Sequence, residues 1–283
     1  MGSISEDVER YLLTRDRVET DRLEMQHSAL QANIGYLLHP DIPQRNHMRV
    51  ADIGTGTGVW LRDLQKQLPN TCILDGFDIS LDQVPDRDLF PTDINYYAHD
   101  ILAPFPAEFW GQYDVVNVRL LTLGLKDNEW EPAIQNLTTL LRPGGYLQWG
   151  DIAMDTGLIK TEIPGSNVDD AERFLKYFRQ AAAGHGKTGT GARQLYPLFE
   201  RCGLQDCKEE ICSLDKPEMR ATLNAATAKG IEHALKAALK ADRDGGALPA
   251  SQIVYDKNAA IKNMKETKSW ISHDMHIVIG RRA

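Results

Sequence analysis

The feature that most constrains this chain is a glycine-rich turn between a short apolar run and an amphipathic segment. Residues 48–53 have the character of a buried strand, Gly54, Gly56 and Gly58 follow at alternate positions, and residues 60–68 have helical periodicity. Because glycine has no Cβ, the backbone N–H groups of such a turn can approach a bound nucleotide closely. The turn therefore predicts a nucleotide-type ligand at the first strand–helix junction of an α/β sheet.

The spacing of the glycines and a neighbouring acid narrow the kind of ligand. The pattern is G-x-G-x-G, and Val59 stands where a dinucleotide-binding loop needs its third glycine. Asp52 lies two residues before the first glycine, where a carboxylate suits a cation better than it suits phosphates. S-adenosylmethionine carries an amino group and a sulfonium and has no pyrophosphate, so this loop favours it over a dinucleotide.

Two further acids follow at the ends of the next predicted strands. Asp78 ends the apolar run at 72–77 and is placed to accept hydrogen bonds from ribose hydroxyls. Asp100 follows where a third strand is expected to end and can accept from an adenine amino group. Any one of these aspartates could be a loop or cap residue, but acids at successive strand ends after a glycine loop favour a cofactor site. Ile79 and Ile101 directly follow Asp78 and Asp100 and are expected to contact the same cofactor.

Short apolar runs and amphipathic stretches alternate from residue 48 onward. This alternation predicts βαβ units and a parallel sheet with right-handed crossovers. After residue 152 the pattern loosens. Further strands are expected at 113–118, 145–149, 207–214 and 275–280, and further helices at 129–141, 168–183, 192–202, 217–240 and 250–268. The expected fold is α/β, a Rossmann-like, seven-stranded, mostly parallel sheet with N-terminal helices and a helical cap insertion.

The predicted elements divide the chain into four segments. We expect an N-terminal helical cap at 1–47, a Rossmann-like core at 48–214, a helical insertion forming part of the cap at 215–270, and the last core strand at 271–283. In the first segment, a helix over 5–38 places apolar side chains on one face, and His39-Pro40 ends it.

Composition limits the partners and the compartment. The chain has 283 residues and a formal net charge of −8 with acidic and basic residues interspersed, which argues against a nucleic-acid groove. It has neither a signal-peptide pattern nor an apolar run of membrane-spanning length, so we expect a cytoplasmic protein without membrane contact. The four cysteines are then expected to be reduced, and their spacing does not predict zinc. The sequence leaves a homodimer open.

Several motifs resemble one protein family. Residues 50–60 resemble the first motif of class I methyltransferases, most of all the fungal methyltransferases of secondary-metabolite pathways. Arg22-Leu23 with Gln26-His27 resembles that group's N-terminal helix, and residues 113–119 and 141–149 resemble its fourth and fifth strands. The likeness covers residues 10–152 well. It implies S-adenosylmethionine as cofactor and methyl transfer to a small, apolar natural product, on oxygen before nitrogen, sulfur or carbon.

Candidate catalytic residues follow from the chemistry of methyl transfer, an in-line displacement that depends on holding two reactants in line. A hydroxyl acceptor benefits from a general base, and His27, on the apolar face of the N-terminal helix, is our first candidate. Arg119 ends the fourth strand and Asp151 follows the fifth. Each has a structural alternative: a hydrogen-bonded histidine, a salt bridge at the rim of the sheet, and a helix cap. The expected cofactor-binding set is Asp52, Gly54, Thr55, Gly56, Gly58, Asp78, Ile79, Asp100, Ile101, Asn117 and Arg119.

The sequence also bears on a metal site, on a phosphate-binding loop and on two other functions. No metal is predicted, because Asn117-Val118-Arg119 stands where metal-dependent methyltransferases have an aspartate, and His273 and His276 fall on opposite faces of a strand. Residues 184–188 resemble the end of a phosphate-binding loop but lack its first glycine, so we expect a mobile loop over the pocket. Two other functions stay open: a methyltransferase-like pericyclase that binds the cofactor without transferring methyl, and a non-catalytic regulator.

Overall fold

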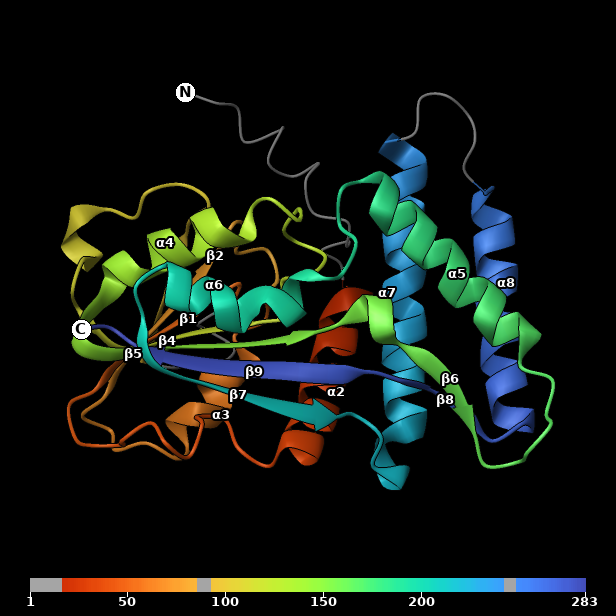
Figure 1. Ribbon diagram of the computed structural model, residues 1–283, viewed down its shortest axis with the longest axis horizontal. Coiled ribbons are helices and arrows are strands. Elements are labelled where there is room, and N and C mark those ends of the chain that lie inside the picture. Colours follow the sequence, from red (N-terminus) through yellow and green to blue (C-terminus); the bar gives the residue numbers. More distant parts are fainter. Residues whose placement is uncertain (1–16, 86–92, 242–247) are drawn as a thin grey trace.

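A computed structural model describes residues 17–85, 93–241 and 248–283. It contains a seven-stranded sheet of order β3-β2-β1-β4-β5-β9-β7, in which β9 runs antiparallel to both of its neighbours (Figure 1). The strands are β1 (Arg49–Ile53), β2 (Ile73–Asp78), β3 (Ile94–Ala98), β4 (Tyr113–Arg119), β5 (Leu141–Ile152), β7 (Gln205–Ser213) and β9 (Asp274–Arg281). The expected Rossmann-like class I methyltransferase fold is therefore confirmed.

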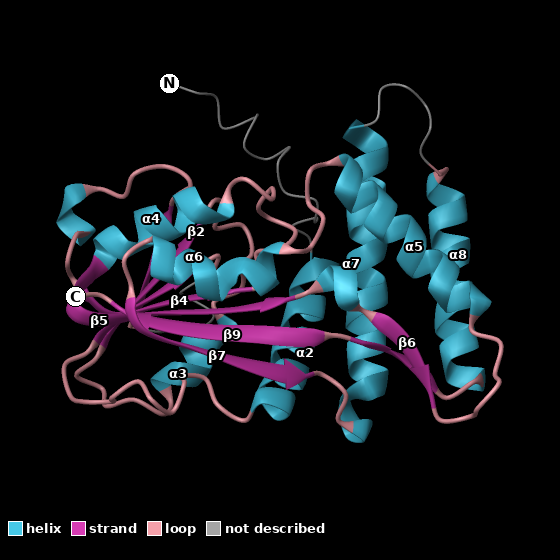
Figure 2. Ribbon diagram, in the orientation of Figure 1, coloured by secondary structure: helices cyan, strands magenta, loops and turns pink. Residues whose placement is uncertain are grey.

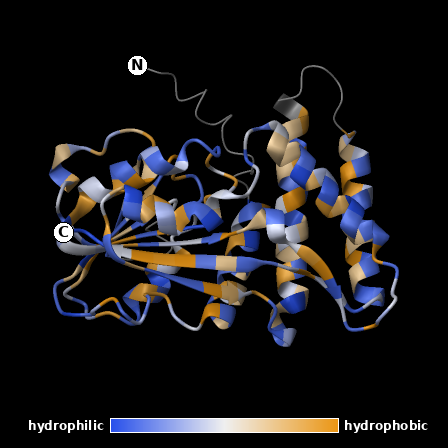
Figure 3. Ribbon diagram, in the orientation of Figure 1, coloured by the Kyte–Doolittle hydropathy of each residue, from blue (hydrophilic) through white to orange (hydrophobic). Residues whose placement is uncertain are grey.

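Helices cover both faces of this sheet. On one face lie α4 (Trp130–Leu140) and α6 (Leu195–Arg201), and on the other lie α3 (Val59–Gln65) and α2 (Arg17–Ile34) (Figure 1). The sheet core under α4 includes Trp130 stacked on Trp149, with ring centroids 5.2 Å apart. Strand β9 is mostly hydrophobic along its length (Figure 3), as expected for a strand buried between two others.

A helical cap stands beyond the carboxyl ends of the central strands (Figure 2). It consists of α5 (Asp169–Gly184), α7 (Arg220–Ala241) and α8 (Ala250–Glu266), with a small antiparallel pair of strands, β6 (Leu158–Thr161) and β8 (Ser269–Ser272). Phe174 and Phe178 of α5 pack with Ile231 of α7 and Ile253 of α8 in one buried cluster. The segment 48–214, which was expected to form the core, also contains β6 and α5. The apolar side chains of these two elements pack in the buried cluster of the cap.

Two local predictions differ from the structure. The first helix ends at Ile34 rather than at 38, because Gly35 takes a left-handed conformation (φ +92°) and its N–H bonds back to the carbonyl of Gln31 at 2.8 Å. The predicted helical residues 5–16 lie outside the described residues. The strands β6 and β8 were not predicted, because each has only four residues. Within the described part of the chain, no helix is long and apolar enough to cross a membrane.

Candidate functional site

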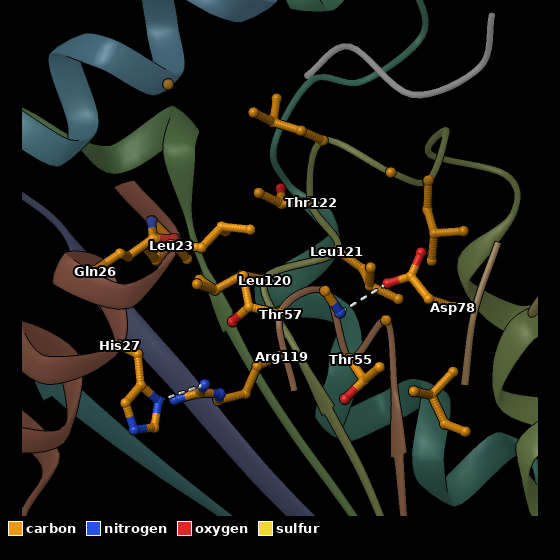
Figure 4. Close-up of a pocket in the computed structure, with 18 of the residues that line it drawn as sticks. Leu23, Gln26, His27, Thr55, Thr57, Asp78, Arg119, Leu120, Leu121 and Thr122 are labelled. Carbon is orange, nitrogen blue, oxygen red and sulfur yellow. Dashed lines mark hydrogen bonds between the residues drawn. The ribbon is translucent and has the colours of Figure 1, made fainter. Parts of the chain in front are cut away.

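A cavity lies between the carboxyl ends of the central strands and the cap (Figure 4). Most of the predicted cofactor residues line it: Asp52, Gly54, Thr55, Gly56, Asp78, Ile79, Asp100, Ile101 and Arg119. His27 lines it as well, whereas Gly58, Asn117 and Asp151 do not. The glycine loop, the acids after the next strands and His27 of α2 therefore meet at one cavity. Gly58, Asn117 and Asp151 lie outside its wall, and their roles are described below.

The three glycines of the loop after β1 take left-handed backbone conformations. Gly54, Gly56 and Gly58 all have positive φ, at 69°, 52° and 71°. The N–H of Gly54 bonds to the carbonyl of Phe77 at 2.8 Å, which ties the loop to β2. At Gly58 a Cβ atom would collide with the hydroxyl of Tyr96, so this third glycine is required by packing and not by contact with a ligand.

Asp52 is buried at the base of the loop. Its carboxylate accepts hydrogen bonds from Thr55 Oγ1 at 2.8 Å and from Asn117 Nδ2 at 2.7 Å. Gln148 Nε2 in turn donates to Asn117 Oδ1 at 2.9 Å. Asn117 therefore positions the Asp52 carboxylate without lining the cavity itself. Burial raises the pKa of Asp52 to about 6, while the nearby Arg119 cation opposes that rise. A carboxylate held in this way can receive an ammonium group from the cavity.

The two acids at the next strand ends also face the cavity. Asp78 accepts a hydrogen bond from the N–H of Gly56 at 2.8 Å (Figure 4), so it lies directly against the glycine loop. Asp100 Oδ1 accepts from the N–H of Leu102 at 2.9 Å, which fixes the turn after β3. Their positions are those of hydrogen-bond acceptors for a nucleoside lying across the ends of β1, β2 and β3.

His27 and Arg119 form a chain of hydrogen bonds with Asp63. Arg119 donates to His27 Nδ1 at 2.9 Å, and His27 Nε2 lies 2.9 Å from Asp63 Oδ2 (Figure 4 shows the first contact). Because a guanidinium only donates, Nδ1 accepts and Nε2 carries the proton. Burial and the Arg119 cation lower the pKa of His27 to about 4. Its free lone pair is thus already used, which favours the alternative of a hydrogen-bonded histidine that positions Arg119.

Arg119 is a cationic residue of the cavity wall. Burial lowers its pKa to about 10, so it stays charged at neutral pH, and its Nε has no hydrogen-bond partner within the described residues. A buried guanidinium with an unused N–H suits a carboxylate ligand, since its fork can donate two parallel hydrogen bonds.

Asp151 lies behind the cavity wall. It is fully buried, and its oxygens accept from the N–H of Leu121 at 2.8 Å, from Trp149 Nε1 at 3.1 Å and from the N–H of Ile152 at 2.9 Å. Burial raises its pKa to about 7. Its role in the structure is to hold the loop after β4, where Leu120 takes a positive φ of 58° at the cavity wall.

Several residues that line this cavity carry a buried, unpaired polar atom and were not predicted as site residues. Among the described residues, Thr57 Oγ1, Gln83 Nε2, Thr122 Oγ1 and His273 Nδ1 have no hydrogen-bond partner, and all four residues line the cavity. Buried polar groups are normally paired, so the unpaired atoms of Thr57, Gln83 and Thr122 indicate that a ligand completes them, whereas His273 Nδ1 lies against Gly157. Thr57 stands at a variable position of the glycine motif, and Gln83 and Thr122 lie outside any motif, so a single sequence gives no signal for them.

The cap side of the cavity is apolar. Its wall includes Ile152, Met154, Leu175, Phe178 and Ile231. Phe178 packs in the buried cluster of the cap and also lines the cavity. This side can hold a hydrophobic molecule next to the cofactor residues.

The structure also shows the surroundings of the loop around Lys187 and of the histidines His273 and His276. The loop around Lys187 does not line the cavity: its ammonium is buried and donates to the carbonyl of Leu123 at 2.6 Å, so the loop is pinned against the loop after β4 instead of covering the pocket. His276 pairs with Glu209 at 2.7 Å and His273 lines the cavity, so they do not converge. No cluster of three or more metal-binding side chains occurs in the part of the chain that the structure describes.

The order of strands, the glycine loop after β1 and the acids after β2 and β3 together define a protein of the class I methyltransferase type. The model of the methyltransferase domain family matches residues 23–209, about two thirds of the chain, and the chain belongs to that family.

Several known proteins are similar to the chain. The methyltransferase grgD of a Penicillium species is 38% identical over 59% of this chain and 60% of its own length. The N-methyltransferase tcpN of Claviceps purpurea is 30% identical over 70% of each chain. The chain thus spans about 60% of the length of grgD. The phosphoethanolamine N-methyltransferase 2 of Haemonchus contortus, solved with S-adenosyl-L-methionine, shares the fold with a TM-score of 0.52 and 16% identity, over 90% of this chain and 51% of that one.

Proposed function

We propose that this protein is an S-adenosylmethionine-dependent methyltransferase that acts on a small, largely apolar natural product of the kind made in fungal secondary metabolism. The observation that carries the proposal is the single cavity that joins Asp78, Asp100 and Arg119 to the apolar side chains of the cap. The likeness to grgD and to tcpN supports the type of reaction and the type of pathway.

The cofactor residues divide by the chemistry of the ligand that they fit. Asp78 and Asp100 present acceptors to ribose hydroxyls and to the adenine amino group. Asp52 suits the ammonium of the amino-acid end. Arg119, whose Nε has no partner in the part of the chain that the structure describes, suits the carboxylate. His27 and Asp63 hold Arg119 in that orientation.

When bound, S-adenosylmethionine supplies an electrophilic methyl group on a sulfonium. Asp52, Asp78, Asp100 and Arg119 would hold this cofactor, and it would supply the methyl group to a lone pair of the acceptor, with the carbon–sulfur electrons returning to sulfur. The chain contributes by holding the acceptor in line between the cap and the loop after β4, and by excluding water with Leu121, Met154 and Phe178.

The acceptor atom follows from the bases that the cavity offers. Our expectation from sequence is oxygen, with His27 as the base. However, the lone pair of His27 is taken by Arg119, and Asp151 lies outside the cavity with its oxygens occupied. An acceptor that needs no strong base, such as an amine nitrogen or an acidic hydroxyl, suits this site better, and the N-methyltransferase tcpN supports nitrogen.

A transfer assay tests the proposal. Purified protein is incubated with methyl-labelled S-adenosylmethionine and fractionated extracts of fungal cultures, and mass spectrometry follows the label, with an Asp78→Ala variant as the matched control. We expect a labelled product with the wild type and a strongly reduced yield with the variant. The mass fragments of the product identify the acceptor atom.

Two other outcomes would replace the proposal. A new product that is isomeric with its precursor and carries no label would establish a methyltransferase-like pericyclase. Binding of the cofactor with no product from any extract, together with recovery of a nuclear protein partner, would establish a regulator.

A further inference from the structure

One side chain in the acceptor half of the cavity has no role in the methyl-transfer scheme above. His273 lies in the short link between β8 and β9, is 7% exposed and lines the cavity. The link is fixed at both ends, because the carbonyl of His273 accepts from the N–H of Leu214 at 2.9 Å and that of Asp274 accepts from Ala153 at 3.1 Å. The imidazole is therefore held in place by backbone contacts on each side.

One edge of the imidazole is closed by protein. A Cβ atom added to Gly157 would lie 2.6 Å from His273 Nδ1, so the ring rests against this glycine. Arg179 fastens Gly157 in turn: its guanidinium donates to the carbonyl of Gly157 and, at 3.2 Å, to that of Met154. Nδ1 is buried here without a hydrogen-bond partner within the described residues.

The other ring nitrogen stays available to a ligand. Nε2 has no hydrogen bond to the described protein, yet it is not among the buried unpaired atoms, so it is the ring nitrogen that the cavity reaches. The proton is better placed on Nε2 than on Nδ1, because an N–H at the closed edge would be unpaired and would face the Arg179 cation. Nε2–H then points a donor into an apolar pocket.

The charged groups around the imidazole keep it neutral. Burial is the main cause and Arg179 the second cause of a pKa lowered to about 4, and Asp274 opposes them. A neutral imidazole with this low basicity is a poor general base for a hydroxyl or an amine. It is a suitable hydrogen-bond donor, and Thr122 Oγ1 is a second unpaired polar atom of the same cavity wall.

We propose that His273 is a specificity residue whose Nε2–H donates a hydrogen bond to a carbonyl oxygen of the methyl acceptor. This rests on the proposed function, and it narrows the substrate class to apolar molecules that carry a ketone, amide or lactam beside the atom that is methylated. An apolar pocket that leaves one donor unpaired rejects ligands without a matching acceptor, because that donor would stay buried and unsatisfied.

The first test measures the tautomer directly. Protein labelled with ¹⁵N in the histidine rings is studied by NMR at neutral pH, and the His273 signals are assigned from their loss in His273→Gln. We expect a protonated Nε2 and an unprotonated Nδ1. A protonated Nδ1 would overturn the proposal.

The second test uses two matched probes, acetophenone and ethylbenzene, which differ in a carbonyl oxygen. With S-adenosylhomocysteine present, we expect acetophenone to bind more tightly and to shift the Nε2 signal, while ethylbenzene does not shift it. His273→Leu is expected to weaken acetophenone binding by roughly three- to tenfold, the worth of one neutral hydrogen bond, without weakening ethylbenzene. His273→Gln, whose amide can replace Nε2–H, is expected to restore the preference.

Controls separate this inference from the proposed function. His276→Leu makes the same change as His273→Leu three residues along, at a histidine paired with Glu209 outside the cavity, and is expected to keep the preference for acetophenone. Equal binding of both probes by the wild type, or a preference that survives in His273→Leu, would overturn the role of His273. Failure of S-adenosylhomocysteine to bind by calorimetry would instead refute the proposed cofactor, whatever the probes show.

Discussion

The buried neutral state of His27 predicts a measurable dependence of stability on pH. Its pKa is 6.5 in an ordinary environment and about 4 in the folded protein. Since the pKa of His27 is lower in the folded protein, only the unfolded chain binds a proton there between pH 6.5 and pH 4. The contribution of the neutral imidazole to the free energy of unfolding is therefore complete above pH 6.5 and is lost as the pH falls toward 4. The two pKa values correspond to a loss of about 2 kcal/mol in the free energy of unfolding between about pH 7.5 and about pH 5. His27 is buried, so solvent does not screen this effect.

Other groups titrate in the same range, so the measurement must be a difference. The pKa of His273 is also lowered, so His273, like His27, destabilises the fold as the pH falls. The pKa values of Asp52 and Asp151 are raised, so these two residues stabilise the fold as the pH falls. Urea unfolding of the wild type and of His27→Gln at both pH values removes these common contributions. We expect the advantage of the wild type to shrink by about 2 kcal/mol at the lower pH. An advantage that is the same at both pH values would refute the inference that His27 is buried and neutral.

The same variant distinguishes a positioning role from a base. Because Nδ1 holds Arg119, His27→Gln is expected to weaken binding of S-adenosylhomocysteine in calorimetry. His27→Asn, whose side-chain oxygen can replace Nδ1 as an acceptor, is expected to lose less. Loss of turnover with unchanged cofactor affinity in both variants would restore His27 as the general base.

Two further predictions concern the cofactor loop. Asp78→Ala is expected to weaken cofactor binding by about 1–3 kcal/mol, the loss of a charged hydrogen-bond partner, and unchanged affinity in calorimetry would place Asp78 outside the cofactor site. Gly58→Ala is expected to lower the melting temperature more than Gly144→Ala, because both glycines have positive φ but only Gly58 faces Tyr96. Tyr96→Phe in the Gly58→Ala background is expected to recover part of the loss, and equal effects of the two alanines would contradict the packing argument.

The cofactor half of the site could be predicted because its signals are local. The glycine loop and Asp78 each stand at the end of one strand, and parallel strands bring their carboxyl ends to the same edge of the sheet. What the sequence could not separate is a residue that lines the cavity from one that holds such a residue from behind. Asn117 lies within β4 and Asp151 near the end of β5. Asn117 bonds to Asp52 and Asp151 accepts from the loop that follows β4, so neither lines the cavity.

The acceptor half could not be predicted because it has no local pattern. Its wall comes from the end of β5, α5, α7 and the β8–β9 link, segments separated by up to about half the chain. Phe178 and Ile231 are apolar residues at helical spacing, which is also the pattern of ordinary packing. His273 drew attention only as half of a possible metal pair, and its unpaired nitrogen depends on Gly157 and Arg179, which lie more than ninety residues earlier.

The helix α2 connects the two halves of the site. On one side His27 holds Arg119 at the cofactor end. On the other side Glu19, fully buried, accepts two hydrogen bonds from Arg22, at 2.7 and 2.6 Å, and lies 2.9 Å from His233 Nδ1 of α7. An unpaired charge buried here would cost several kcal/mol, so these groups stay bonded only if α2 and α7 keep one relative position. In the proposed function, the side chain that receives the cofactor's carboxylate and the helix α7 that lines the acceptor pocket are both held by α2. A change in either contact of α2 is therefore expected to affect the binding of both ligands.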